Sequence, residues 1–350
     1  MTMEDILTMA VQKKASDIFL IAGQPVSYKI NGNIEKQGES PLKPDQLFSM
    51  VEHLYEMGNR DRKYGEQGDD DFSVSLACVG RFRVNVFRQR GSWSAVLRVV
   101  NFQLQDVSTM GIPKSVLELS ERKKGLVLVT GSAGSGKSTT LAYIIDEINK
   151  SRNCHILTLE DPIEFLHTHN KSIVSQREIG IDSKDYNRAL KAGMRESPDV
   201  ILIGEMRDLE TIEIAMTAAE TGHLVLSTLH TVGAANTIDR IIDVFPPQQQ
   251  QQIRIQLSMV LRSVVSQQLL PTTDGRQVPA FEILKANNAI RTLIRDGKVH
   301  QIPSTIATAK EEGMLSMDSS IMELYQSGKI KKETALLYAM NRESMERILS

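Results

Sequence analysis

The segment Gly125-Leu-Val-Leu-Val-Thr-Gly131-Ser-Ala-Gly-Ser-Gly-Lys137-Ser138-Thr139 decides the fold class of this chain. Its first part, residues 126–129, is an apolar run of strand length, and a glycine-rich stretch follows. Apolar residues then recur at helical spacing, at Leu141, Ile144, Ile145 and Ile148. A buried strand, a glycine-rich loop and a helix in this order match the Walker A motif at every required position. We therefore predict an α/β fold built around a phosphate-binding loop (P-loop).

This loop is a candidate site for ATP and magnesium. Glycines let successive backbone N–H groups point at phosphate oxygens, and the N-terminus of the following helix favours anions. Lys137 is predicted to reach the β- and γ-phosphates, and the Ser138 hydroxyl to bind Mg²⁺. The alternative is a glycine-rich turn that binds nothing, which leaves the lysine and the hydroxyl unexplained. The predicted binding residues are Gly131, Ser132, Ala133, Gly134, Ser135, Gly136, Lys137, Ser138 and Thr139.

More apolar runs follow at residues 155–159, 200–203 and 224–226, with helical stretches between them. Short strands that are apolar on both faces and alternate with helices predict a mainly parallel sheet covered on both sides. Pro247 is expected to start a helix with apolar positions at Ile253, Leu257, Val260, Leu261, Val264 and Val265. Residues 121–350 are thus one predicted domain, which ends in helices from about residue 286.

The part before residue 106 reads as a smaller α/β domain, residues 1–105, and we expect a linker over residues 106–120. Residues 4–14 have helical spacing, and strand-like chemistry begins at Ser16. Residues 28–33 resemble a hairpin with an Asn31-Gly32 turn. Polar and apolar residues alternate over residues 80–87, which is typical of a half-buried strand.

Composition argues against several classes of protein. Charged residues make up 24% of the 350 residues and hydrophobic residues 41%, and the formal net charge is -2. A net-acidic chain is poorly suited as a whole to binding nucleic acid. The two cysteines, Cys78 and Cys154, cannot form a disulfide scaffold or a four-cysteine zinc site. No apolar run approaches the ~20 residues that span a bilayer, and the acidic N-terminus does not resemble a signal peptide. We expect a cytoplasmic protein that reaches the membrane through partners.

A second candidate element is Asp199-Val-Ile-Leu-Ile-Gly204-Glu205. Four apolar residues predict a buried central strand, and Glu205 comes just past its carboxyl end, where ligands bind in open α/β sheets. Gly204 stands where the Walker B motif usually has its acidic residue, so the motif is atypical. Glu205 is predicted to hold Mg²⁺ directly or through water. A solvent-facing loop glutamate is the alternative.

A third element, Thr158-Leu-Glu160-Asp161-Pro-Ile-Glu164-Phe, places three carboxylates in five residues at the end of another predicted strand. Hydrolysis requires a group that orients and deprotonates water in line with the γ-phosphate. The residues themselves leave Glu160 and Glu164 open for this role, and a charged turn is the alternative.

A fourth element carries His223 and His230 on either side of a predicted strand, seven residues apart. That spacing is poor for one metal site on a single element. The remaining alternatives are strand-end histidines with satisfied hydrogen bonds and a sensor of the γ-phosphate.

With these elements in this order, the chain resembles the type II/IV secretion ATPase superfamily and, within it, the type IV pilus retraction ATPases. The resemblance runs from Ala15-Ser-Asp-Ile-Phe-Leu to Gly313-Met314, and Ala289-Ile-Arg-Thr-Leu-Ile-Arg-Asp296 resembles the retraction motif Ala-Ile-Arg-Asn-Leu-Ile-Arg-Glu. Ser132-Ala133 stands where the family usually has Pro-Thr, Phe19 where histidine is frequent, and Thr292 where the motif has asparagine.

The resemblance implies a PAS-like N-terminal domain, a RecA-like ATPase domain and a homohexameric ring. It implies water activation by Glu164, support of Mg²⁺ and hydrolysis by Glu205, and nucleotide sensing by His223 and His230. It also implies that arginines of the N-terminal domain act on a neighbour's nucleotide, and the candidates are Arg81, Arg83 and Arg98. A solvated strand face is the alternative for these arginines.

The function expected from the resemblance is Mg-dependent ATP hydrolysis that powers pilus retraction and twitching motility. The expected partners are an inner-membrane pilus platform protein and other pilus motor ATPases, at the inner face of the cell membrane. Alternatives are a pilus extension or type II secretion ATPase, which is usually longer and often carries a four-cysteine zinc module, and an accessory retraction ATPase. A RecA-like nucleic-acid translocase and a non-enzymatic nucleotide-binding scaffold are alternatives of other classes.

Overall fold

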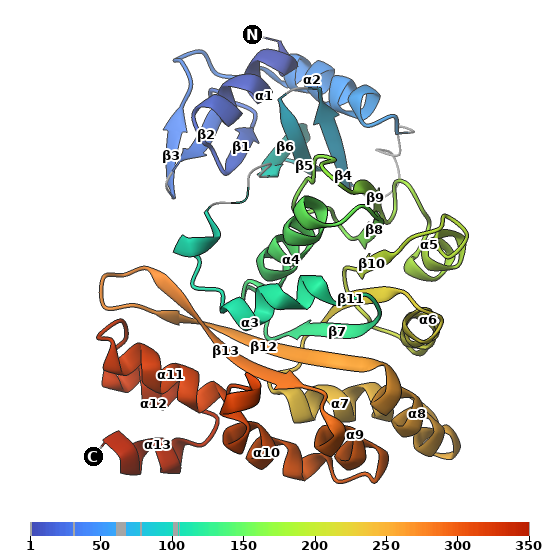
Figure 1. The fold of residues 1–350 in the computed structure, drawn as a ribbon. Coiled ribbons are helices and arrows are strands. Elements are labelled where there is room, and N and C mark those ends of the chain that lie inside the picture. Colours follow the sequence, from blue (N-terminus) through green and yellow to red (C-terminus); the bar gives the residue numbers. More distant parts are fainter. Residues whose placement is uncertain are drawn as a thin grey trace. The chain divides into compact units, whose positions relative to one another are not determined.

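The computed structural model describes residues 2–30, 32–60, 68–77, 79–100, 104 and 106–349. It divides into two compact units (Figure 1). The first comprises Met1–Gln103 with Glu164–Leu166, and the second Leu104–Ile163 with His167–Ser350. Both combine a sheet with helices, so the predicted α/β class is confirmed. Cys78 and Asn31 lie outside the described residues.

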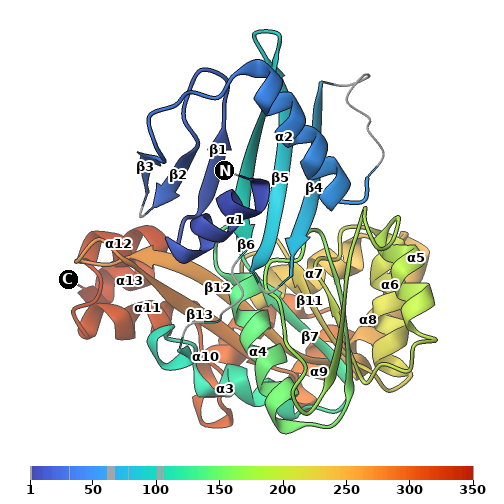
Figure 2. The same cartoon turned by 90° about the horizontal axis from the view of Figure 1, so that it is seen from above.

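Among its described residues, the first unit has a six-stranded antiparallel sheet in the order β3-β2-β1-β6-β5-β4. Helices α1 (Met3–Gln12) and α2 (Pro44–Met57) lie on one face of it (Figure 2). Their apolar side chains form a single core with those of the strands. The strands are β1 (Asp17–Leu20), β2 (Ser27–Ile30), β3 (Asn33–Lys36), β4 (Asp69–Leu76), β5 (Gly80–Gln89) and β6 (Ser92–Val100).

Two sequence predictions for this unit are confirmed. On β5, Phe82, Val84 and Val86 are fully buried whereas Arg83 and Asn85 are exposed, as the alternation predicts. Strands β2 and β3 pair antiparallel as a hairpin, with Ile30 opposite Asn33.

The second unit contains, within the described residues, a seven-stranded sheet in the order β13-β12-β7-β11-β10-β8-β9. All neighbours are parallel except β13, which pairs antiparallel with β12. The predicted parallel sheet is therefore confirmed. Its strands are β7 (Gly125–Thr130), β8 (His155–Glu160), β9 (Ile173–Glu178), β10 (Val200–Ile203), β11 (Leu224–Leu229), β12 (Leu261–Pro271) and β13 (Gln277–Lys285).

Both faces of this sheet are covered by helices. Along β7, Val127 and Val129 pack with α4 (Lys137–Ser151), whereas Leu126 and Leu128 pack in a second core with helices of the opposite face. Successive side chains of a strand point to opposite faces, so a strand buried on both sides reads as a continuous apolar run. The opposite face carries α5 (Tyr186–Gly193), α6 (Leu209–Glu220), α7 (Ala234–Asp243) and α8 (Pro247–Val260).

Short helices flank this core. Residues 106–121 contain η1 (Val107–Thr109), α3 (Lys114–Leu117) and η2 (Glu118–Glu121), and Val116 and Leu119 pack against the core on the α4 side. The predicted helical tail is present. It consists of α9 (Asn288–Arg295), η3 (Val299–Gln301), α10 (Ile302–Thr308), η4 (Lys310–Glu312), α11 (Met317–Gln326), α12 (Lys332–Tyr338) and α13 (Arg342–Leu349). None of the helices in the described part of the chain combines the length and the apolar character that a bilayer crossing requires.

The predicted helix from Pro247 through Val265 is wrong in its second half. Helix α8 ends at Val260, and Leu261 begins β12. Val264 and Val265 pair in register with Leu128 and Val129 of β7, and they pack into opposite cores. β-branched residues favour such a strand, and a short apolar run fits helical and strand spacing equally well.

Candidate functional site

The loop between β7 and α4 has a backbone that requires glycine. Gly131, Gly134 and Gly136 have φ values of 142°, 75° and 88°, which side chains rarely allow. Gly136 is the N-cap of α4 and offers no side-chain cap. The first N–H groups of α4 are therefore left for a ligand, and the positive end of the helix dipole favours an anion.

The side chains of this loop fit a phosphate group with its cation. Lys137 is buried, and its Nζ donates to the carbonyl oxygens of Gly131 at 2.8 Å and Ser132 at 2.9 Å, which holds the ammonium group over the loop. The Ser135 hydroxyl is buried and finds no hydrogen-bond partner among the described residues. An orphaned buried hydroxyl costs free energy unless a ligand satisfies it. Ser138, at the second position of α4, is half-buried.

Strand β12 supports the loop from behind. A β-carbon at Gly131 would lie 2.2 Å from the carbonyl oxygen of Gln267, and one at Gly136 would lie 2.8 Å from its Nε2. The buried Gln267 Oε1 also accepts a hydrogen bond of 2.7 Å from the Thr140 hydroxyl. Gln267 therefore leaves no room for a β-carbon at either glycine, through its backbone at Gly131 and through its side chain at Gly136.

Replacing Gly131 by alanine is expected to lower the free energy of unfolding by about 2–3 kcal/mol, because the new β-carbon meets backbone at a positive φ. Gly134→Ala is the matched control, since its β-carbon would meet nothing within 4 Å although its φ is also positive. Urea unfolding followed by circular dichroism measures both variants. Equal losses would contradict the steric explanation.

A cavity of about 740 Å³ adjoins the start of α4. Gly136, Thr139, Thr140 and Gln267 line one side of it. The rest of its wall comes from residues 109–112, from the tip of the β12–β13 hairpin and from residues 328–329. A mixed polar and apolar cavity beside an anion-binding loop has the character of a small-molecule site.

Glu205 lies at the same edge of the sheet as the P-loop. It comes two residues after β10, its side chain is 11% exposed, and its carboxylate pairs with Arg207 and, at 3.3 Å, with His230 Nε2. Thr130, the last residue of β7, pairs with Leu229, the last residue of β11. Because β7, β11 and β10 are parallel neighbours, the structure brings the P-loop, His230 and Glu205 to one edge. Glu205, Arg207 and His230 line a cavity of about 440 Å³ there.

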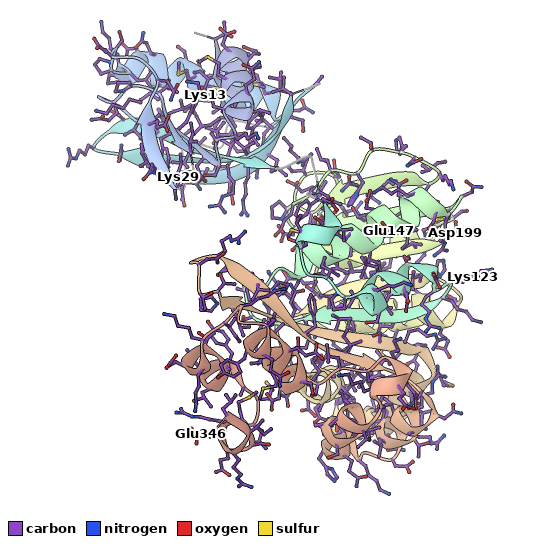
Figure 3. All side chains as sticks on the ribbon, turned by 60° about the vertical axis from the view of Figure 1, so that its left-hand side comes forward. Lys13, Lys29, Lys123, Glu147, Asp199 and Glu346 are labelled. Carbon is purple, nitrogen blue, oxygen red and sulfur yellow. The ribbon has the colours of Figure 1, made fainter. Side chains whose placement is uncertain are left out.

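His223 lies at the other edge. Its backbone oxygen accepts from Gly125 N at the start of β7, and its Nδ1 lies 2.9 Å from the carbonyl oxygen of Ala218. Lys123 and Asp199, which precede β7 and β10, mark this amino edge of the sheet (Figure 3). The structure therefore does not bring His223 to the P-loop of its own chain, because the six residues of β11 separate the two histidines by roughly 20 Å. Its predicted sensor role stays a prediction.

The structure distinguishes the two candidate carboxylates that follow β8. Glu160 Oε1 accepts hydrogen bonds from Thr158 Oγ1 at 2.7 Å and Gln176 Nε2 at 3.3 Å. Glu164 is exposed and has no hydrogen-bond partner among the described residues. It belongs to the short segment that groups with the first unit. Glu164 is thus the less constrained of the two side chains, and its catalytic role stays a prediction.

The three candidate arginines share one face of the first unit's sheet. Arg83 on β5 is the cross-strand neighbour of Arg98 on β6. Arg83 pairs with Asp71, Arg98 Nε pairs with Asp17 at 3.3 Å, and Arg81 contacts the Ser75 hydroxyl at 3.5 Å. All three therefore make contacts within their own unit, and a role at a neighbour's nucleotide stays a prediction.

Sequence reasoning missed Tyr186, the first residue of α5. Burial, with smaller contributions from Asp161, Glu205 and Glu160, raises the pKa of its hydroxyl, which is therefore protonated at neutral pH. Tyr186 lies on a helix and is distant in sequence from Gly204 just after β10, so residue spacing could not predict that the two lie close together. The unusual Gly204 was the one available signal, because it leaves space beside Glu205.

The amino-acid sequence of this chain is similar to those of several known proteins. The family model described as "Type II/IV secretion system protein" matches residues 1–343. The chain is 43% identical over 336 residues to the type IV pilus retractation ATPase PilT of Pseudomonas aeruginosa, covering 96% of this chain and 97% of that protein. It is 39% identical over 341 residues to the type IV pilus ATPase PilU of the same organism, covering 97% and 89%.

A solved structure agrees with this similarity. The crystal structure of the pilus retraction motor PilT with bound ADP matches the fold with a TM-score of 0.90 at 45% identity, over 99% of both chains.

Proposed function

The chain belongs to the type II/IV secretion system protein family, and we propose that it is a motor ATPase that powers the retraction of type IV pili. The observation that carries the proposal is the convergence of the P-loop, Glu205 and His230 at one edge of the parallel sheet. The similarity to PilT over almost the whole length of both chains supports the same reading.

ATP is the proposed ligand of the P-loop. The N–H groups at the start of α4 and the Lys137 ammonium group bind its phosphates, and residues 131–139 form the cradle. The cavity beside Thr139 and Gln267 takes the base and the sugar. Ser138 and Glu205 would hold Mg²⁺, Glu205 directly or through water. Bound there, the ion would neutralise negative charge on the phosphate oxygens.

Glu164 is the proposed base for hydrolysis to ADP and phosphate. Its exposed carboxylate is free of protein hydrogen bonds within the described residues, so it can orient water and accept its proton. His230 contacts Glu205 and is placed to respond to the state of that carboxylate. This pair is the proposed sensor at the site.

The working unit is a homohexameric ring in which Arg81, Arg83 or Arg98 reaches a neighbour's nucleotide. An arginine supplied in trans raises hydrolysis rates by roughly 10³–10⁵-fold in other nucleoside triphosphatases. Driving a domain switch from 1:99 to 99:1 needs a difference of about 5.5 kcal/mol in binding between the two states. Several charge-assisted hydrogen bonds to a lost phosphate are of that order. The ring acts on an inner-membrane pilus platform protein from the cytoplasmic side, together with other pilus motor ATPases.

Replacing Glu205 by glutamine is expected to lower kcat by about 30-fold, because the amide keeps the shape but loses the charge that faces Arg207 and His230. The malachite-green phosphate assay of the purified protein measures this effect. Glu210→Gln is the matched control, since Glu210 pairs with Lys191 on the exposed surface of α6 and α5. A Glu205→Gln variant as active as the control would remove Glu205 from the site.

Ring formation and ATPase rate of the purified protein, paired with pilus retraction in a deletion strain, test the proposed function. Restored twitching by the gene alone supports a retraction motor. Restoration that also requires a second ATPase would favour an accessory retraction ATPase. Stimulation of hydrolysis by DNA with a steep salt dependence would instead favour a nucleic-acid translocase.

A further inference from the structure

The space beside Gly204 is occupied by a side chain from another element. A β-carbon at Gly204 would lie 2.8 Å from the Tyr186 hydroxyl oxygen and 3.3 Å from the carbonyl oxygen of Leu159. Gly204 is not among the glycines with positive φ, so the lack of space and not the backbone conformation excludes a side chain. Gly204 is the position where a Walker B motif usually carries its acid. The Tyr186 hydroxyl therefore fills the start of the path that such a side chain would take.

Tyr186 is held by its ring while its hydroxyl remains available. The ring packs against the core on the α5 side of the sheet, and Asp185 caps the same helix by accepting from Arg188 N at 2.7 Å. Within the described part of the chain, the hydroxyl makes no hydrogen bond. The charged groups around it are the carboxylates of Asp161, Glu205 and Glu160 together with Arg207.

We infer that the Tyr186 hydroxyl takes the place of the missing Walker B acid and acts as a positioning residue at the hydrolysis site. A neutral hydroxyl adds a hydrogen-bond donor among Glu160, Asp161 and Glu205, whereas a further carboxylate would increase their mutual repulsion. The donor orders these carboxylates and the water between them. This inference rests on the proposed ATPase function.

Tyr186→Phe tests the inference because it removes a single oxygen and keeps the ring. The expected result is a kcat about tenfold lower, since the hydrogen-bond donor beside the three carboxylates is lost. KM for ATP and the melting temperature stay at the wild-type values, because the P-loop is untouched. Tyr325→Phe on α11 is the matched control, a partly buried tyrosine on a helix outside the site. A Tyr186→Phe variant with wild-type kcat would overturn the inference, and so would one whose loss lies entirely in KM.

Gly204→Ala provides an independent readout of the same contact. Its β-carbon is expected to push the hydroxyl away, which lowers both kcat and the melting temperature. Adding Tyr186→Phe removes the atom that clashes, so the double variant should regain most of the lost melting temperature while keeping the low kcat of Tyr186→Phe. If Gly204→Ala is equally damaging with and without the hydroxyl, the assignment of that space to Tyr186 is wrong.

The two proposals fail in different ways. A wild-type protein that neither binds nor hydrolyses ATP would end the proposed function, and the recovery of melting temperature in the double variant would still report the contact. An active wild-type protein with an equally active Tyr186→Phe variant would end this inference and leave the ATPase function standing.

Discussion

Replacing Lys137 by alanine is expected to lower ATP hydrolysis by roughly 10³-fold, about 4 kcal/mol of transition-state stabilisation. The ammonium group is held over the P-loop by the carbonyl oxygens of Gly131 and Ser132, so its charge is positioned before any ligand arrives. A preorganised cation stabilises developing charge without the cost of reorienting solvent. Part of the loss will appear as weaker nucleotide binding, because the same charge faces the phosphates in the ground state.

The measurement is a coupled ATPase assay together with titration of a fluorescent ATP analogue. Lys150→Ala is the matched control, since Lys150 lies on the same helix and pairs with Asp146 on the exposed side. The control should retain wild-type activity, and both variants should form rings. A Lys137→Ala protein that hydrolyses ATP at the control's rate would refute the assignment of the P-loop as the nucleotide site.

Glu164→Gln is expected to abolish turnover to a similar degree, roughly 10³-fold, while nucleotide binding persists. The amide can still contact water but cannot accept its proton, so the change removes general-base catalysis together with a negative charge near the attacking oxygen. Binding should persist because the phosphates are held by the P-loop and not by this carboxylate. The variant should therefore accumulate as an ATP-bound ring.

Glu160→Gln is the comparison that decides between the two carboxylates left open by the sequence. Its Oε1 already accepts from Thr158 and Gln176, so its loss is expected to cost less, about tenfold in kcat, through altered loop geometry. Single-turnover hydrolysis with excess protein separates the chemical step from product release for both variants. Should Glu160→Gln prove the more damaging change, the base is Glu160 and not Glu164.

The sequence was most informative where spacing along one element sets geometry. The strand–loop–helix pattern around Lys137 depends on neighbouring residues alone, and the structure has the predicted order of β7, loop and α4. Parallel strands also bring their carboxyl ends to one edge, so placing Glu205 and His230 near the P-loop required nothing beyond the topology. The same reasoning places His223 away from the site. It is seven residues before His230, and that distance along β11 leads from the carboxyl edge of the sheet to its amino edge.

The sequence predicted the structure less well where packing between distant segments determines it. Nothing local marks the change from α8 to β12 at Leu261, because Val264 and Val265 fit a helical stripe as well as a strand between two cores. Tyr186 was missed for a related reason. Its hydroxyl reaches Gly204 because α5 packs beside β8 and β10, which is a property of the folded chain.

The close fit between β12 and the P-loop has a consequence for how freely this loop can vary. Gly131 and Gly136 face Gln267 at distances that admit no added carbon, whereas Ser132 and Ala133 face outward and are exposed. Sequence variation in the loop should therefore be confined to Ser132 and Ala133. The departure of these two residues from the Pro-Thr that is usual in the family falls within the range of replacements that the positions tolerate. Random mutagenesis of the loop should recover many functional replacements at these two positions and almost none at the two glycines.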